Sequence, residues 1–293
     1  MMNLKPEVVA QLERVLGSVE MLLPKATRPV DWATCHAANW RRHSFSGYLE
    51  PVKVTDTTRL DELLGVDDQK AVMISNTRQF LQGLPANNAL LWGSRGTGKS
   101  SIVKALLNEY GNQGLRIIQV EKEDLIYISE IFAAIEEQPY RFIMLCDDLT
   151  FETGELAYKM LKSALDGSVY SAPDNVLIYV TSNRRYLLPE YEGDHLGGKY
   201  VKGELQQSEI QEEKSSLSDR FGLWVPFHVF SQDRYLEAVR LCIERWSKQL
   251  GRDIPWSKDL EQAAIKWSHD KTKRCGRTAY QFSKNWVGKY LLK

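Results

Sequence analysis

Apolar residues in the middle of the chain fall into short uninterrupted runs, and segments of helical period separate these runs. The apolar runs predict short buried strands, over residues 89–92, 116–120, 141–146 and 175–181. In the intervening segments apolar positions recur every three or four residues and predict helices, over residues 70–82, 101–110, 124–137 and 153–166. Alternating strands and helices of this kind predict an α/β fold with a doubly wound parallel sheet covered on both faces.

Both ends of the chain have a different pattern. Residues 6–23 have the apolar spacing of an amphipathic helix, and residues 31–50 are aromatic and basic without periodicity. After residue 230 the pattern predicts only helices, over residues 232–249, 258–268 and 277–292. We therefore expect three parts, which are an N-terminal helical extension (1–60), an α/β domain (61–230) and a C-terminal helical unit (231–293).

Composition excludes several classes of protein. The 293 residues carry 38 Lys+Arg and 38 Asp+Glu, so no overall charge attracts the chain to nucleic acid or membrane. The 4 cysteines lie far apart without a C-x-x-C pair, which excludes a disulfide framework and a cysteine zinc site. No uninterrupted apolar stretch reaches the ~18 residues of a membrane span, and no signal-peptide pattern occurs. We expect a cytoplasmic protein with no membrane partner.

A glycine-rich segment between the first central strand and its helix matches G-x-x-x-x-G-K-[ST]. Its residues are Gly93, Ser94, Arg95, Gly96, Thr97, Gly98, Lys99 and Ser100, followed by Ser101. Glycines let the backbone wrap closely around phosphates, so that successive N–H groups and the helix N-terminus face the anion. In this motif Lys99 reaches the β- and γ-phosphates and the Ser100 hydroxyl is a Mg²⁺ ligand.

Two carboxylates end the third central strand. Asp147 and Asp148 follow the apolar run Phe142–Cys146, and the C-terminal edge of a parallel sheet faces the ligand crevice. Asp147 suits Mg²⁺, which prefers oxygen ligands, and Asp148 suits a general base that activates water. Glu152 is a rival base in the same turn. Taken alone, the pair is also compatible with two acids that cap the next helix.

Three further polar residues gain meaning only from their order in the chain. Asn183 follows the next strand, where its amide would bridge the γ-phosphate and the attacking water, although a Ser-Asn pair there is ordinarily a turn. Arg220 and Arg277 lie in the segments Leu217–Gly222 and Arg274–Ala279. An arginine delivered to the γ-phosphate stabilises transition-state charge, whereas an isolated arginine is ordinarily a surface residue.

These five elements, in this order, resemble the AAA+ ATPases over about residues 60–293. In that resemblance the phosphate loop corresponds to Walker A, the strand ending in Asp147 and Asp148 to Walker B, and Asn183 to sensor 1. Arg220 corresponds to the arginine finger and Arg277 to sensor 2 at the start of a lid helix. The segment Leu64-Gly65-Val66 resembles the adenine pocket, so Gly65 and Val66 are expected to bind the cofactor.

The resemblance is strongest to a bacterial group of uncharacterised AAA+ proteins and more distant to helicase loaders and replication initiators. It implies ATP and Mg²⁺ as cofactors. It also implies that Arg220 acts on the site of a neighbouring protomer, and therefore a homo-oligomer. Two departures matter. Asp148 stands where most of the family has Glu, and the segment after residues 116–120 lacks an aromatic-apolar-Gly pore loop, which disfavours a threading unfoldase.

We therefore expect an AAA+ ATPase that uses Mg-ATP hydrolysis to change its own conformation or to remodel a protein or nucleic-acid-associated partner. The alternative is a nucleotide-bound switch or adaptor with little turnover, and a small-molecule kinase ranks third. The client stays open. Three segments allow a surface role as well as a partner contact: residues 31–50 and 271–293 for nucleic acid, and the polar insertion 189–216 for a protomer or partner.

Overall fold

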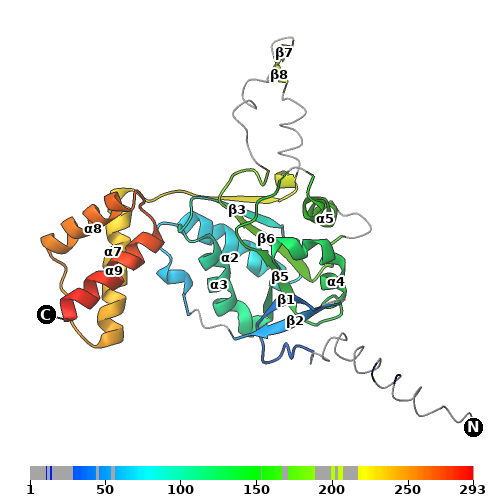
Figure 1. The fold of residues 1–293 in the computed structure, drawn as a ribbon, viewed down its shortest axis with the longest axis horizontal. Coiled ribbons are helices and arrows are strands. Elements are labelled where there is room, and N and C mark those ends of the chain that lie inside the picture. The colour runs from blue at the N-terminus through cyan, green and yellow to red at the C-terminus, as the bar shows by residue number, and fades with distance from the viewer. Residues whose placement is uncertain are drawn as a thin grey trace, which may run out of the picture.

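A computed structural model describes residues 11, 14, 29–43, 46–53, 57–152, 154–166, 171–188, 199–201, 204–206 and 217–292. Seven of its strands form one sheet in the order β2-β1-β4-β5-β6-β3-β9 (Figure 1). The bounds of these strands are Ala37–His43 (β1), Ser46–Val52 (β2), Ala89–Gly93 (β3), Leu115–Gln119 (β4), Arg141–Cys146 (β5), Val176–Ser182 (β6) and Leu223–Phe227 (β9). Within this sheet only the β1–β2 pair is antiparallel. The expected α/β class is confirmed.

Helices cover both faces of the sheet, which is why its central strands, β3 to β6, are buried along nearly their whole length. In β5, Ile143 and Leu145 face the side of α2 and α3, whereas Phe142 and Met144 face α4 and α5. The bounds of the core helices and 3₁₀ turns are Leu60–Glu62 (η1), Asp67–Leu81 (α2), Lys99–Tyr110 (α3), Gly111–Gln113 (η2), Lys122–Tyr127 (η3), Ile128–Ala133 (α4) and Leu156–Leu165 (α5).

The four strands expected in the central region are present within one residue of their expected bounds, as β3, β4, β5 and β6. The helix expected over residues 124–137 is shorter, because a 3₁₀ turn (η3) precedes α4. Strand β9 was not expected from the sequence. It contains Pro226, which a strand tolerates at the edge of a sheet, and β9 is the edge strand beside β3.

The helical extension expected over residues 1–60 is wrong for residues 37–52, which form the β1–β2 hairpin and lengthen the core sheet. Strand β1 pairs in parallel with β4, and the alternation in this short strand buries Ala38 and Trp40. The helix expected over residues 6–23 lies outside the described residues, apart from residues 11 and 14. Residues 31–50 therefore belong to the core, and whether they also contact nucleic acid stays a prediction.

A buried arginine ties the N-terminal segment to the core. Arg116 on β4 is 3% exposed, and its guanidinium lies 4.1 Å from the centre of the Tyr140 ring. It donates hydrogen bonds to the main-chain oxygens of Trp32 (2.8 Å), Gly111 (2.6 Å) and Leu115 (2.7 Å). Trp32 precedes β1, whereas Gly111 and Leu115 lie in η2 and β4, so one buried side chain links the N-terminal segment to the core through charge-assisted hydrogen bonds.

Replacing Arg116 by Ala is expected to lower the free energy of unfolding by about 3 kcal/mol or more, because three buried carbonyls lose charge-assisted hydrogen bonds. Urea unfolding measures the change. The matched control is Arg41→Ala on neighbouring β1, whose exposed ion pair with Glu50 (3.1 Å) should contribute less than about 1 kcal/mol. Equal losses in the two variants would contradict the anchoring role.

The C-terminal residues form a three-helix unit beside the core, with bounds Gln232–Leu250 (α7), Lys258–Asp270 (α8) and Gly276–Leu291 (α9) (Figure 1). All three helices expected there are present. The unit has its own apolar core, which includes Tyr235, Ile243 and Phe282. Ser231 and Ser257 begin α7 and α8 by accepting hydrogen bonds from main-chain N–H groups of the first turn. We call this unit the lid.

Most of the polar insertion expected over residues 189–216 lies outside the described residues. Its described parts are an antiparallel pair of short strands, Lys199–Val201 (β7) and Glu204–Gln206 (β8). Within the described residues, no helix has both the length and the apolar character needed to cross a bilayer.

Candidate functional site

The glycine-rich segment forms a tight loop from the end of β3 to the first turn of α3. Gly93 has φ 129°, and a Cβ there would lie 2.0 Å from the main-chain oxygen of Phe227 on β9. Gly96 has φ 82°, and a Cβ there would lie 2.8 Å from the Cys275 sulfur, just before α9. Only glycine fits these positions, so the loop is held closely between the edge strand and the lid.

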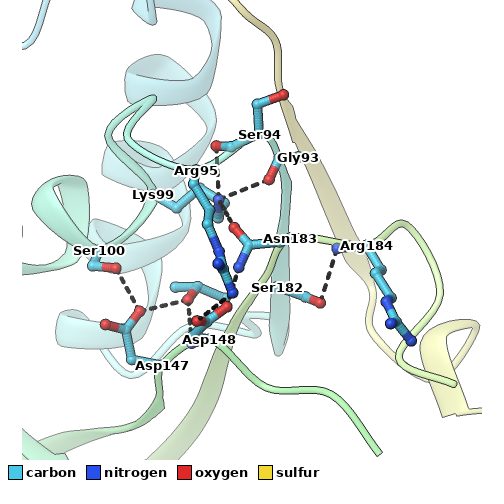
Figure 2. Close-up of polar contacts among 11 residues, drawn as sticks. Gly93, Ser94, Arg95, Lys99, Ser100, Asp147, Asp148, Ser182, Asn183 and Arg184 are labelled. Carbon is cyan, nitrogen blue, oxygen red and sulfur yellow. Dashed lines mark hydrogen bonds and ion pairs between the residues drawn. The ribbon is translucent and has the colours of Figure 1, made fainter. Parts of the chain in front are cut away.

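Lys99 lies at the centre of this loop. Its side chain is largely buried, and Nζ donates hydrogen bonds to the main-chain oxygens of Gly93 (2.8 Å) and Ser94 (2.9 Å) and to Asn183 Oδ1 (3.1 Å) (Figure 2). Burial is the largest cause that lowers the pKa of the Lys99 ammonium, and Arg95 acts in the same direction. A polyanion bound in the loop would oppose both effects, because an opposite charge favours the charged form.

Asp147 extends from the end of β5 toward the first turn of α3. Its Oδ1 accepts a hydrogen bond from the hydroxyl of Ser100 (Figure 2). The same oxygen accepts a hydrogen bond from the hydroxyl of Thr181. The parallel register pairs Cys146 of β5 with Val180 of β6, which brings the next residues, Asp147 and Thr181, together. Thr181 is a site residue that sequence reasoning missed. Its position at the C-terminal end of a strand, two residues before Asn183, was the available signal.

Asp148 has a positive φ of 54°, a backbone conformation that aspartate tolerates better than most residues. Its main-chain N–H donates to Thr181 Oγ1 (2.9 Å), which fixes this turn. The carboxylate accepts a hydrogen bond from Asn183 Nδ2 and pairs with Arg95 Nη2 at 3.4 Å. Asn183 therefore connects Lys99 on one side with Asp148 on the other, and the four side chains converge (Figure 2).

The rival base, Glu152, is not part of this convergence. It is exposed, and its main-chain N–H donates to Glu155 Oε1 (2.7 Å). Asp148 lines the pocket between the loop and the lid, and Glu152 does not. The geometry therefore favours Asp148 among the two candidates for the base.

A pocket of about 990 Å³ lies between the loop, the residues before α2, and the lid. It includes every loop residue from Arg95 to Ser101 together with Asp147, Asp148, Thr181 and Asn183. Cations outnumber carboxylates among its charged lining residues, which are Arg95, Lys99, Lys104, Arg245 and Arg277 against Glu62, Asp147 and Asp148. A cleft of this size with an excess of cations around a phosphate-type loop suits a nucleoside polyphosphate.

The lid closes one side of the pocket. Arg277, at the start of α9, lines it, and the Arg277 N–H donates to the Gly96 oxygen (3.2 Å). Sequence reasoning missed two more lid contributions: Trp246 and Tyr280 line the pocket as a stacked pair with ring centres 6.0 Å apart, and Arg245 pairs with Glu62 at 3.3 Å. The sequence pattern predicts only that these residues lie in helices.

The expected adenine-pocket segment flanks the same cavity. Leu64 and Val66 line it together with Phe230, whereas Gly65 lies between them outside the lining, and its oxygen accepts a hydrogen bond from Arg234 Nη1 (3.1 Å). The apolar part of the pocket is therefore built by the residues before α2 and by the lid. Such a surface suits the flat face of a nucleobase.

Arg220 is the one expected catalytic residue that the structure does not bring to this pocket. It follows Ser218 in the turn before β9, and its Nε donates to Oδ1 of Asp166 at the end of α5. That helix covers the sheet face opposite to α2 and α3. Gly93 and Ser94 also lie outside the lining, although they accept hydrogen bonds from Lys99.

The family described as "Protein of unknown function (DUF815)" matches residues 33–290. Two solved structures of RuvB variants from Thermotoga maritima align with a TM-score of 0.52 each, at 17% and 16% identity. Each alignment covers 77% of this chain, and 63% and 64% of the respective RuvB chains, so this chain spans less than two thirds of them. The likeness shows a shared fold and nothing finer. No curated protein sequence matches.

Proposed function

We propose that this chain, which belongs to the family described as "Protein of unknown function (DUF815)", is an AAA+ ATPase that binds and hydrolyses ATP between its α/β core and its lid. One observation carries the proposal. The phosphate loop, two carboxylates from β5 and the Asn183 amide from the end of β6 converge at a single pocket. Taken singly, each of these elements has an ordinary structural explanation, and their convergence is what favours ATP hydrolysis.

The phosphates of ATP would lie along the loop from Gly93 to Ser100. Successive main-chain N–H groups and the N-terminus of α3 attract negative charge there. Lys99 Nζ hydrogen-bonds to the Gly93 and Ser94 oxygens, which holds the ammonium at the loop. Phosphate oxygens would be better acceptors for this ammonium than neutral carbonyls, because charge-assisted hydrogen bonds are stronger.

The oxygen donors beside the loop fit Mg²⁺. The Ser100 hydroxyl contacts the Asp147 carboxylate directly, so both oxygens are available at one point. No cluster of three or more His, Cys, Asp or Glu side chains in the described residues could hold a metal by itself. This agrees with Mg²⁺, which is commonly held by one or two protein oxygens, waters and substrate phosphates. When bound, the ion would neutralise charge on the phosphates.

The water that attacks the γ-phosphorus would lie between Asp148 and Asn183. Asp148 accepts the water proton, and the Asn183 amide, hydrogen-bonded to both Lys99 and Asp148, orients the water relative to the phosphate. Arg277 would contact the phosphates from α9 and couple their loss to lid movement, because its main-chain N–H already contacts the loop at Gly96. Hydrolysis would thereby change the angle between lid and core and remodel a partner.

Arg220 would act in a neighbouring protomer, which makes the active form a homo-oligomer. This role is supported by the position of Arg220, which lies outside the pocket of its own chain. The client, and any nucleic acid, stay unassigned. A nucleotide-bound switch with little turnover is the second candidate, favoured by Asp148 itself, which is shorter than Glu and is already engaged by Asn183 and Arg95.

Replacing Asp148 by Asn is the test of the proposed hydrolysis. The amide keeps the size of the side chain and cannot accept a proton, so phosphate release from Mg-ATP should fall by about 10²–10⁴-fold. Equilibrium binding of ATP should be retained. Glu152→Gln is the matched control, because the same chemical change at the rival position should leave release within about twofold of the parent chain.

Three outcomes separate the candidates. Loss of phosphate release in Asp148→Asn alone supports hydrolysis with Asp148 as the base. Loss in Glu152→Gln alone would reverse the assignment of the base. Tight ATP binding with no phosphate release from the parent chain at any protein concentration would favour the switch.

A further inference from the structure

The phosphate loop contains one long charged side chain besides Lys99. Arg95 stands among glycines, Ser94 and Thr97, and its side chain crosses the site to the carboxylate of Asp148 (Figure 2). Nothing in the folding of the loop requires it, because its side chain is 66% exposed in this pair. The main chain of the loop is held by other contacts, such as the Thr97 hydroxyl on the Ser94 oxygen at 2.7 Å.

The contact between Arg95 and Asp148 is easily exchanged. The two charged atoms are 3.4 Å apart, and the side chains are 66% and 56% exposed. Ion pairs between groups this exposed contribute little to stability, so a stronger anion can displace the carboxylate. A terminal phosphate is such an anion, since it carries more charge and accepts the two parallel hydrogen bonds that a guanidinium offers.

The Arg95 side chain is long enough to contact the terminal phosphate of a bound ATP. Asn183 receives a hydrogen bond from Lys99 at its oxygen and donates one to Asp148 from its nitrogen. In the proposed function Lys99 holds the γ-phosphate and Asp148 accepts the proton of the water that attacks it. A guanidinium that contacts Asp148 from the loop, and that lines the same pocket, therefore lies beside the phosphorus under attack.

We infer that Arg95 is a catalytic residue that leaves Asp148 for the γ-phosphate when ATP binds. This inference rests on the proposed function and goes beyond it, because it assigns each site a second arginine of its own chain, besides Arg277 of the lid and Arg220 of a neighbour. The exchange has two consequences. The guanidinium neutralises charge on the γ-phosphoryl oxygens, and the Asp148 carboxylate is released to accept a proton.

The resulting step is balanced. The water oxygen forms a bond to the γ-phosphorus while the bond from that phosphorus to the β,γ-bridging oxygen breaks, and its electron pair leaves with ADP. One water proton goes to the Asp148 carboxylate. In the structure, Arg95 and Asn183 both contact that carboxylate, so the arginine must move to the γ-phosphate before the carboxylate is fully available to the proton.

Because ADP has no γ-phosphate, the test is the preference for ATP over ADP. The dissociation constants of Mg-ATP and Mg-ADP are measured at equilibrium for the parent chain, Arg95→Ala, Arg95→Lys and Arg184→Ala. In Arg95→Ala the preference for ATP should fall by about 10–100-fold through weaker ATP binding, with ADP binding unchanged. Arg95→Lys, which keeps the charge and loses the paired donors, should be intermediate.

Arg184→Ala is the matched control. Arg184 is an exposed arginine next to Asn183, and its side chain points away from the pocket (Figure 2). Its removal should leave the preference unchanged. A single-turnover measurement with saturating ATP adds a second readout, in which Arg95→Ala should slow phosphate release by about 10-fold or more.

Two other outcomes would overturn the inference. If Arg95→Ala keeps the ATP preference of the parent chain, Arg95 does not contact the γ-phosphate, and the inference fails while the proposed function stands. A parent chain that binds neither nucleotide removes the proposed function and the inference together. Unchanged ADP binding in Arg95→Ala also shows that the variant is folded.

Discussion

Lys99→Ala should lower the affinity for ATP by about 10²–10⁴-fold and abolish measurable phosphate release. The side chain would supply two charge-assisted hydrogen bonds to phosphate oxygens, each worth about 1.5–3 kcal/mol, and 1.4 kcal/mol corresponds to tenfold in a binding constant. The variant should still fold, because the atoms that Lys99 contacts now are two main-chain oxygens and the partly exposed Asn183. Isothermal titration and a phosphate-release assay measure the two effects.

Lys159→Ala is the control for Lys99→Ala, because Lys159 is exposed on α5 and does not line the pocket. Its ATP affinity should match that of the parent chain. An affinity of Lys99→Ala within threefold of the parent would place the phosphates elsewhere and remove the basis of the proposed ATPase.

Replacing Arg220 by Ala should reduce turnover by about 10³–10⁵-fold, the range attributed to an arginine that stabilises the transferring phosphoryl group. ATP binding to the same protomer should be unchanged, because Arg220 does not line its pocket. The residue is held at the end of α5 by Asp166, so it is positioned for a surface contact and not for its own nucleotide. In the parent chain, specific activity should rise with protein concentration.

A mixing experiment isolates the role of Arg220 in a neighbouring site. Asp148→Asn supplies an intact Arg220, and Arg220→Ala supplies an intact Asp148, so neither is active alone. When the two variants are mixed, interfaces that combine both intact residues should form, and a substantial fraction of the parent activity should return. Lys99→Ala is the control, because Lys99 and Asp148 belong to the same site of one chain, so mixing Lys99→Ala with Asp148→Asn should return no activity.

Two results would count against this arrangement. One is a specific activity that does not change with protein concentration and is unaffected in Arg220→Ala, which would make each protomer a complete enzyme. The other is an Arg220→Ala variant that loses activity and gains none on mixing. In that case Arg220 acts by holding its own chain together through Asp166, and unfolding measurements should show a loss of stability.

Much of the site was accessible from the sequence because its requirements are local. The phosphate loop needs glycines at fixed spacing and a helix that begins directly afterwards, and both are properties of eight consecutive residues. Likewise, an apolar run that ends in Asp147 and Asp148 predicts a strand with carboxylates at its end. The strands β3 to β6 are recognisable because a parallel sheet buries both faces and each strand is therefore continuously apolar.

Other features depend on contacts between distant segments. The β1–β2 hairpin forms because β4, whose residues pair with residues 80 positions earlier in β1, offers it an edge, and no local periodicity predicts that pairing. The short strand β9 contains a proline and is defined only by β3. Because local patterns do not encode such partners, the expected helical extension over residues 1–60 was wrong for the hairpin, and β9 was missed.

The amino-acid order alone determined the α/β class, the phosphate loop and the candidates Asp148 and Glu152 for the base. The tertiary structure decided which groups surround each candidate base. It placed Asp148, Asn183 and Arg95 together and left Glu152 outside, because the register of β5 against β6 and the turn at positive φ set the direction of each side chain. Side-chain direction depends on strand register and backbone torsion angles, and both arise only when separate segments pack against one another.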